Sequence, residues 1–242
     1  MDIAWIGHAA FRLRGRDAAV VLDPCPSSTG FRLGRPQADI VTISNPAPEH
    51  AWAQGVGGEP AHLDAPGEYE IHNVLVTSVV TNRPAVARPA PDPDEPADGD
   101  EPDKPLTPPP TPTPPTATVI RNLGFVVTID EVVVAHLGDL RSEPSPQAME
   151  ELSRADVLLI PVGGNGHLDA KTAVKVAGAI DARLVIPMLY KVGPETALLD
   201  PVDAFLSAMG AAAPETLDNH INVTSGGLGQ HTVVQVLAPR GV

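Results

Sequence analysis

Histidine, aspartate and glutamate side chains recur just beyond short apolar segments of this sequence. His8, His50, Asp139 and His167 each follow such a segment closely, and Glu49 directly precedes His50. Imidazole and carboxylate groups bind divalent metal ions such as Zn²⁺, and they take up and release protons near neutral pH. If the fold brings these loops together, their shared chemistry is metal binding or acid–base catalysis.

Short apolar runs rich in Val, Ile and Leu predict the strands that would position these loops. The predicted strands cover residues 3–5, 11–13, 18–22, 40–43, 74–80, 124–129, 132–135, 157–161, 184–187 and 232–237. The predicted helices cover residues 146–153, 169–180 and 201–209. Ser145 is the expected N-cap of the first helix, because Pro146 suits the first helical position. Strand meanders therefore come first and alternating strands and helices follow, which indicates sheets packed face to face with helices outside.

One segment differs from the rest in composition. Residues 84–116 contain 13 Pro, with seven acidic residues against two basic ones. Such a segment buries too little apolar surface to offset the entropy lost on ordering, so we predict a disordered acidic insert. The remainder, residues 1–83 and 117–242, is predicted to form a single domain. The insert is open to two interpretations, a docking arm for a proline-binding partner or a passive surface insertion.

The overall charge limits the classes of partner. The chain carries a net charge of −14, which argues against binding to nucleic acid or to an anionic membrane surface. No stretch approaches the ~18 apolar residues needed to cross a bilayer, and the N-terminus has no signal-peptide pattern. The expected location is therefore the cytoplasm. The lone Cys25 cannot form an internal disulfide, which excludes a secreted disulfide scaffold.

Several short motifs occur together in a characteristic order. They are Gly7-His8, the loop Ile43 to His50, Ala65 to Ile71, Gly138-Asp139, Val162-Gly163-Gly164, and Ile186-Pro187-Met188. In this order the chain resembles the ascorbate-6-phosphate-lactonase-like branch of the metallo-β-lactamase fold, whose members are often labelled Zn-dependent hydrolases. The resemblance covers the chain except the insert. It implies an α/β (α+β) architecture, a four-layer αββα sandwich, with a metal site where loops from both sheets meet.

The family's metal-binding loop has the pattern His-x-His-x-Asp-His, and this chain departs from it. Asn45 and Ala47 stand where the first two His would be, Glu49 replaces the Asp, and His50 matches the final His. Asp139 matches the Asp that bridges two metals in the family. An alanine coordinates nothing, and the amide oxygen of Asn45 is a poor ligand for Zn²⁺.

Two further family ligands are also replaced. The middle His would fall near residues 81–82, where no His occurs, and Leu189 stands at the position of the late His. Pro46 and Pro48 stiffen the metal loop, which makes a rescue by loop movement harder. The resemblance therefore predicts that the two-metal site is lost.

What survives implies at most one ion, zinc or manganese. Glu49, His50 and Asp139 would hold this ion, and His8 or His167 would be a fourth ligand. We expect Asp139, His50 and His8 to be the catalytic residues if the protein is an enzyme, with Asn45 and His167 as auxiliary groups. His8 has a second interpretation as a residue that contacts substrate, and His167 as ordinary surface polarity.

Two classes of function follow from these residues. In the first, a reduced site hydrolyses an ester, lactone or phosphoester bond of a small molecule that the sequence does not identify. In the second, the chain is a non-catalytic relative that serves as a binding or assembly scaffold. Members of this branch often assemble, so a homo-oligomer is a further expectation.

Overall fold

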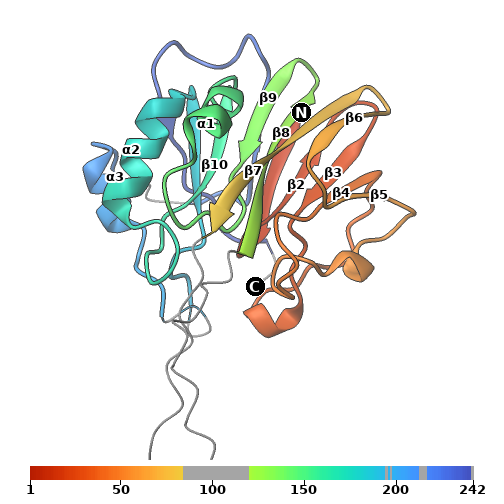
Figure 1. Ribbon diagram of the computed structural model, residues 1–242, viewed down its shortest axis with the longest axis horizontal. Helices are drawn as coiled ribbons and strands as arrows, with labels where there is room; N and C mark the ends of the chain where they lie inside the picture. Colours follow the sequence, from red (N-terminus) through yellow and green to blue (C-terminus); the bar gives the residue numbers. More distant parts are fainter. Residues whose placement is uncertain (84–119, 194–195, 197, 213–216, 241–242) are drawn as a thin grey trace, which may run out of the picture.

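The computed structural model describes residues 1–83, 120–193, 196, 198–212 and 217–240. The predicted insert, residues 84–116, lies outside the described residues. The docking role considered for it therefore stays a prediction. Two β-sheets face each other, and helices cover one outer face (Figure 1). This arrangement confirms the predicted α/β sandwich.

The first sheet has six strands in the order β12-β1-β2-β3-β4-β5. Its strands are β1 (Asp2–Gly7), β2 (Ala10–Arg14), β3 (Ala19–Leu22), β4 (Ile40–Thr42), β5 (Ala61–Leu63) and β12 (His220–Asn222). Pairing is antiparallel from β12 to β3 and parallel from β3 to β5. A turn over residues 15–18 joins β2 to β3, with the amide of Gly15 donating to the carbonyl of Ala18 at 2.9 Å.

The second sheet has seven strands in the order β13-β11-β10-β9-β8-β7-β6. Its strands are β6 (Gly67–Ile71), β7 (Val74–Arg83), β8 (Ile120–Ile129), β9 (Val132–His136), β10 (Val157–Pro161), β11 (Leu184–Met188) and β13 (Val233–Val234). Pairing is antiparallel from β6 to β9 and parallel beyond β9. The β7–β8 ladder continues until Arg83 faces Ile120.

The α-helices of the described chain pack on the outer face of the second sheet (Figure 1). They are α1 (Pro146–Leu152), α2 (Ala170–Ile180) and α3 (Asp203–Ala208). The hydroxyl of Ser145 accepts the amide of Ala148 at 3.2 Å, which confirms the predicted N-cap. None of the described helices has the length and hydropathy needed to span a bilayer.

Loops rather than α-helices cover the described outer face of the first sheet. Val21 and Val41 point to this face and pack against Ala38 and Val56 from flanking loops. Two 3-10 helices, η1 (Ser27–Thr29) and η2 (Ala53–Gly55), are the regular elements there. The loop sequences are rich in Pro and Gly, which disfavour longer helices. The fourth layer of the predicted sandwich is therefore irregular.

The main core fills the space between the two sheets. Trp5, Phe11 and Leu13 of the first sheet and Phe125 and Val127 of the second belong to one buried cluster. Alternation along each strand sends these side chains inward, as expected for stacked sheets. The sheets thus form a rigid base for the loops at their ends.

Candidate functional site

The carboxyl ends of several strands meet at one edge of the sandwich. In the first sheet β1, β3 and β4 run in the same direction, because β1 and β3 are both antiparallel to β2 and β3 is parallel to β4. In the second sheet β9, β10 and β11 are parallel. Loops that leave these strands carry His8, Asp23 and His50 from the first sheet, and Asp139 and His167 from the second.

Asp23 anchors the first half of the site, and sequence reasoning missed it. Its carboxylate is fully buried and accepts the Nδ1–H of His50 at 2.8 Å. It also accepts the backbone amide of Ser44 at 2.8 Å and the Ser44 hydroxyl at 2.5 Å. The signal was an Asp directly after the apolar strand that ends at Leu22, the same pattern that marked Asp139.

Asp23 and His50 stabilise each other's charged forms. Burial alone would raise the pKa of Asp23, but the hydrogen bond from His50, nearby charges and the Ser44 hydroxyl bring it below its usual value. Burial alone would lower the pKa of His50, but the hydrogen bond and the charge of Asp23 raise it above its usual value. His50 is therefore held by Nδ1 and presents Nε2 to the interior of the site.

Asp139 anchors the second half of the site and is held on both carboxylate oxygens. Its Oδ1 lies 2.6 Å from Nδ1 of His167 and 3.2 Å from Nε of Arg141. Its Oδ2 lies 3.2 Å from Nη2 of Arg141, so the guanidinium contacts the carboxylate through two nitrogens. Nε2 of His50 lies 3.9 Å from the same Oδ2. The structure thus brings His50, Asp139 and His167 together, and it adds Arg141, which the sequence did not indicate.

The cations around Asp139 keep its carboxyl group ionised. Burial would raise the pKa of Asp139, but the hydrogen bond with His167 and the charges of His50, His167 and Arg141 lower it far below its usual value. Asp139 is therefore a carboxylate at every working pH, and its negative charge is already matched inside the protein.

A buried amide supports Asp139 from behind. The side-chain oxygen of Asn122 accepts the backbone amide of Asp139 at 3.0 Å, and its NH₂ group donates to Thr81 at 2.7 Å and to the carbonyl of Leu137 at 2.9 Å. Thr81 lies where the family resemblance expected a metal-binding His. Its hydroxyl instead holds the amide that orients the Asp139 turn.

Gly138 allows the loops of the two sheets to touch. Its φ is +57°, and a Cβ at this position would lie 2.3 Å from Cβ of Ser44. The carbonyl of Ser44 accepts the amide of Leu123 from β8 at 2.8 Å. A side chain at residue 138 would push the two halves of the site apart.

His8 lies beside His50 in a left-handed backbone conformation, with φ of +54°. The two rings meet edge-on with centroids 4.9 Å apart, and Nε1 of Trp5 donates to the carbonyl of His8 at 3.1 Å. Burial, and then the charges of His50 and His167, lower the pKa of His8 to about 3. His8 is therefore neutral, and its buried Nδ1 has no hydrogen-bond partner among the described residues.

Other predicted residues have different surroundings. Asn45 is buried, accepts the amide of Ala47 at 2.9 Å and donates to the Ser44 hydroxyl at 3.4 Å, so it shapes its own loop. Glu49 is half-buried, and its charge raises the pKa of His50 less than the charges of Asp23 and Asp139 do. Leu189 is fully buried in the main core, and a Cβ at Gly163 would lie 2.0 Å from its carbonyl oxygen.

These side chains do not fit the predicted zinc or manganese ion. Among the described residues, no group of three or more His, Cys, Asp or Glu side chains is arranged to hold a metal. His50 offers one unpartnered nitrogen, but both oxygens of Asp139 already contact the permanently charged guanidinium of Arg141. A divalent cation at this carboxylate would have to displace that cation or lie against it.

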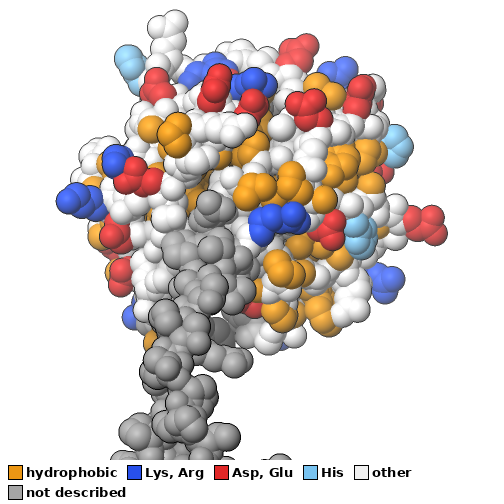
Figure 2. Space-filling model, viewed as in Figure 1, with side chains coloured by type: hydrophobic (Ala, Val, Ile, Leu, Met, Phe, Trp, Pro, Cys, Tyr) orange, Lys and Arg blue, Asp and Glu red, His pale blue; other side chains and the backbone are white. Residues whose placement is uncertain are grey.

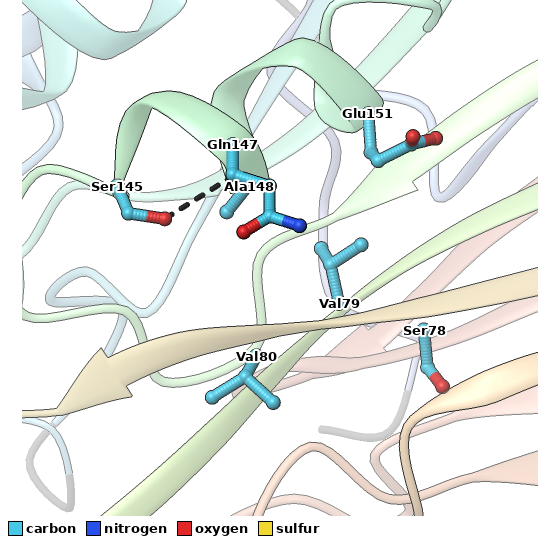
Figure 3. Close-up of a pocket in the computed structure, with 7 residues that line it drawn as sticks. All are labelled: Ser78, Val79, Val80, Ser145, Gln147, Ala148 and Glu151. Atoms are coloured by element: carbon cyan, nitrogen blue, oxygen red, sulfur yellow. Dashed lines mark hydrogen bonds between the residues drawn. The ribbon is translucent and has the colours of Figure 1, made fainter.

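One cavity lies at the start of β8 and another beside the middle of β7. The cavity at β8 has a volume of about 550 Å³ and opens beside the loop Ile43 to His50, which corresponds to the family's metal-binding loop. Its lining residues are Ile43, Ser44, Asn45, Pro46, Ala51, Asp64 and Arg121. Hydrophobic side chains gather over the half of the molecule that carries β5 and β6 (Figure 2). The second cavity, of about 290 Å³, lies between α1 and β7 and contains no His, so it does not join the site (Figure 3).

Comparisons with known proteins agree with this architecture. The model of the β-lactamase superfamily domain matches residues 2–189. A UPF0173 protein of Pyrococcus abyssi is 26% identical over 213 residues, with 78% of this chain and 83% of that protein covered. A UPF0173 metal-dependent hydrolase of Carboxydothermus hydrogenoformans is 24% identical over 207 residues, covering 80% and 86%.

A solved structure is also similar along nearly its whole length. It is a Thermotoga maritima protein assigned to the Zn-dependent hydrolases of the metallo-β-lactamase superfamily, with 28% identity and a TM-score of 0.69. The similarity covers 98% of this chain and 97% of that one. Because the family model matches well over half of the sequence and the two-sheet sandwich is the same, this chain belongs to the β-lactamase superfamily.

Proposed function

We propose that this protein is a non-hydrolytic relative of the metal-dependent hydrolases, which keeps the superfamily scaffold to bind a small molecule. One observation carries the proposal. The carboxylate that would bridge metals, Asp139, has both oxygens in contact with Arg141, and one of them also with His167. A guanidinium remains charged at every working pH, so this carboxylate is neutralised without a metal.

We expect the small molecule to bind in the cavity beside the loop Ile43 to His50. Its volume of about 550 Å³ lies within the range of ordinary ligand pockets. Ile43, Pro46 and Ala51 provide apolar walls, and Asp64 and Arg121 provide polar groups for orientation. The location in the cytoplasm and assembly into homo-oligomers stay predictions from the sequence.

A second candidate function is favoured by a different observation. Nε2 of His50 is buried without a hydrogen-bond partner among the described residues and lies 3.9 Å from Oδ2 of Asp139. Similar proteins are named metal-dependent hydrolases. In this alternative Glu49, His50 and Asp139 hold one zinc or manganese ion, and the protein hydrolyses an ester, lactone or phosphoester.

Metal content separates the two candidates. The full chain is purified with Zn²⁺ or Mn²⁺ in the medium, dialysed against metal-free buffer, and measured by elemental analysis beside a His50→Ala variant. We expect far less than one equivalent of metal in both proteins, and no hydrolysis of model ester, lactone and phosphodiester substrates. About one equivalent in the wild type that disappears in His50→Ala would overturn the proposal in favour of the one-ion hydrolase.

A further inference from the structure

The Arg141 side chain occupies a position set by its neighbours on two sides. It follows Asp139 by two residues, and its guanidinium contacts both carboxylate oxygens while the side chain is only 13% exposed. On the other side the guanidinium lies close to Gly166, whose φ is +100°. A Cβ at this residue would lie 2.8 Å from Nη1 of Arg141. The loop after β10 thus leaves room for the guanidinium because residue 166 has no side chain.

Imidazole nitrogens surround the same carboxylate. Nδ1 of His167 lies 2.6 Å from one oxygen of Asp139, and Nε2 of His50 lies 3.9 Å from the other. Two ligands on one tetrahedral Zn²⁺ lie roughly 3.3 Å apart when each bond is about 2.0–2.1 Å. The two histidine–aspartate distances bracket this value, and Nε2 of His50 has no hydrogen bond to lose.

We propose that Arg141 takes the place of a metal ion in this protein, and that it closes a latent divalent-cation site formed by Asp139, His50 and His167. The inference rests on the proposed function, since it assumes that the wild-type site holds no metal. It goes further by naming one residue whose charge excludes the ion. The other donors are retained, so removing that one charge re-creates a site for a cation.

The test is a Zn²⁺ titration of the full chain by calorimetry, after extensive dialysis, in the wild type and four variants. We expect Arg141→Ala to bind about one equivalent more than the wild type. Arg141→Lys keeps the positive charge, so it should bind Zn²⁺ roughly tenfold more weakly than Arg141→Ala or not at all. Arg183→Ala is the matched control, because Arg183 also pairs with an aspartate, Asp156, but away from these histidines. The double variant Arg141→Ala/His50→Ala should lose the added equivalent.

The outcomes distinguish this inference from the proposed function. If Arg141→Ala is folded and binds no more Zn²⁺ than Arg183→Ala, the inference is wrong while the proposed function stands. If the wild type itself binds one equivalent through His50, both are wrong. If Arg141→Ala fails to fold, Arg141→Gln is refolded with and without Zn²⁺. Recovery of cooperative unfolding only with Zn²⁺ supports the latent site, and equal recovery or equal failure contradicts it.

Discussion

Each half of the site contains an aspartate hydrogen-bonded to a histidine, but the two pairs differ in what else they contact. The Asp23–His50 pair is fully buried, and Ser44 donates two further hydrogen bonds to its carboxylate. The Asp139–His167 pair is closer to solvent and carries Arg141 as an additional cation. The same two side-chain types thus form a closed structural pair in one sheet and a charge-matched, more accessible pair in the other.

The largest loss of stability is expected from Asp23→Ala. This change leaves His50 without its partner and removes the acceptor for the amide and hydroxyl of Ser44. Loss of one member of a buried, hydrogen-bonded pair costs about 3–5 kcal/mol, so we expect the free energy of unfolding in urea to fall by that amount. Asp23→Asn keeps the shape and one acceptor and should lose less. Equal, small losses in both variants would mean that the pair is not structural.

A smaller loss is expected from Arg141→Ala. The carboxylate of Asp139 keeps its hydrogen bond with His167, so it is not left bare, and the backbone amide of Asp139 keeps its bond to Asn122. Removing one charged donor from a partly buried pair costs about 1–3 kcal/mol in urea unfolding. A loss as large as that of Asp23→Ala would show that the two halves of the site are structurally equivalent.

The pH dependence of stability should also separate the histidines. The pKa of His50 is raised, so its contribution is present below the unfolded value of about 6.5 and is lost as pH rises through the folded pKa. The pKa of His8 is lowered to about 3, so its contribution is present above about 6.5 and declines as pH falls.

Urea unfolding of three proteins across the pH range checks these signs. His50→Gln should remove the decline of stability on the alkaline side, which amounts to at most about 1.4 kcal/mol per pH unit. His8→Gln should leave that decline intact and flatten the acidic side instead. An unchanged alkaline limb in His50→Gln would contradict the assignment of a raised pKa.

The smallest effect is expected outside the site. Ser145→Ala removes the hydroxyl that accepts the amide of Ala148 at the start of α1, and a lost N-cap costs about 1 kcal/mol. The helix α1 packs on β7 and β8 and contributes no contact to the carboxylate of Asp139. Ser145→Ala should therefore bind as little Zn²⁺ as the wild type. A change in metal binding would mean that the helical layer is coupled to the site.

Sequence patterns predicted most of the strands and helices, because the spacing of apolar residues and the length of each apolar run indicate the type and bounds of an element. The buried strands β10 and β11 and the helix α2 begin and end within one residue of their predicted bounds. Strands β5 and β12 were missed, since three-residue edge strands with exposed His62 or His220 have no clear alternation. In the described chain, loops and two 3-10 helices cover the outer face of the first sheet, because Pro and Gly interrupt these segments.

The site was predicted in part. His50, Asp139 and His167 meet as the family resemblance suggested, because each follows a strand whose carboxyl end lies at the same edge. Asp23 and Arg141 were missed for different reasons. Asp23 follows a strand as Asp139 does but has no family motif around it, and the contact of Arg141 depends on turn geometry that spacing alone does not encode.

The ladder between β7 and β8, which extends until Arg83 pairs with Ile120, has a consequence for how this chain tolerates changes in length. Because Arg83 pairs with Ile120, the chain segment between these two residues forms a closed loop. The entropy of closing such a loop grows only with the logarithm of its size, about 0.6 kcal/mol for each doubling. A flexible connection of another length would therefore change the stability of this ladder very little, while the pairing of both sheets and the contacts of the site stay the same.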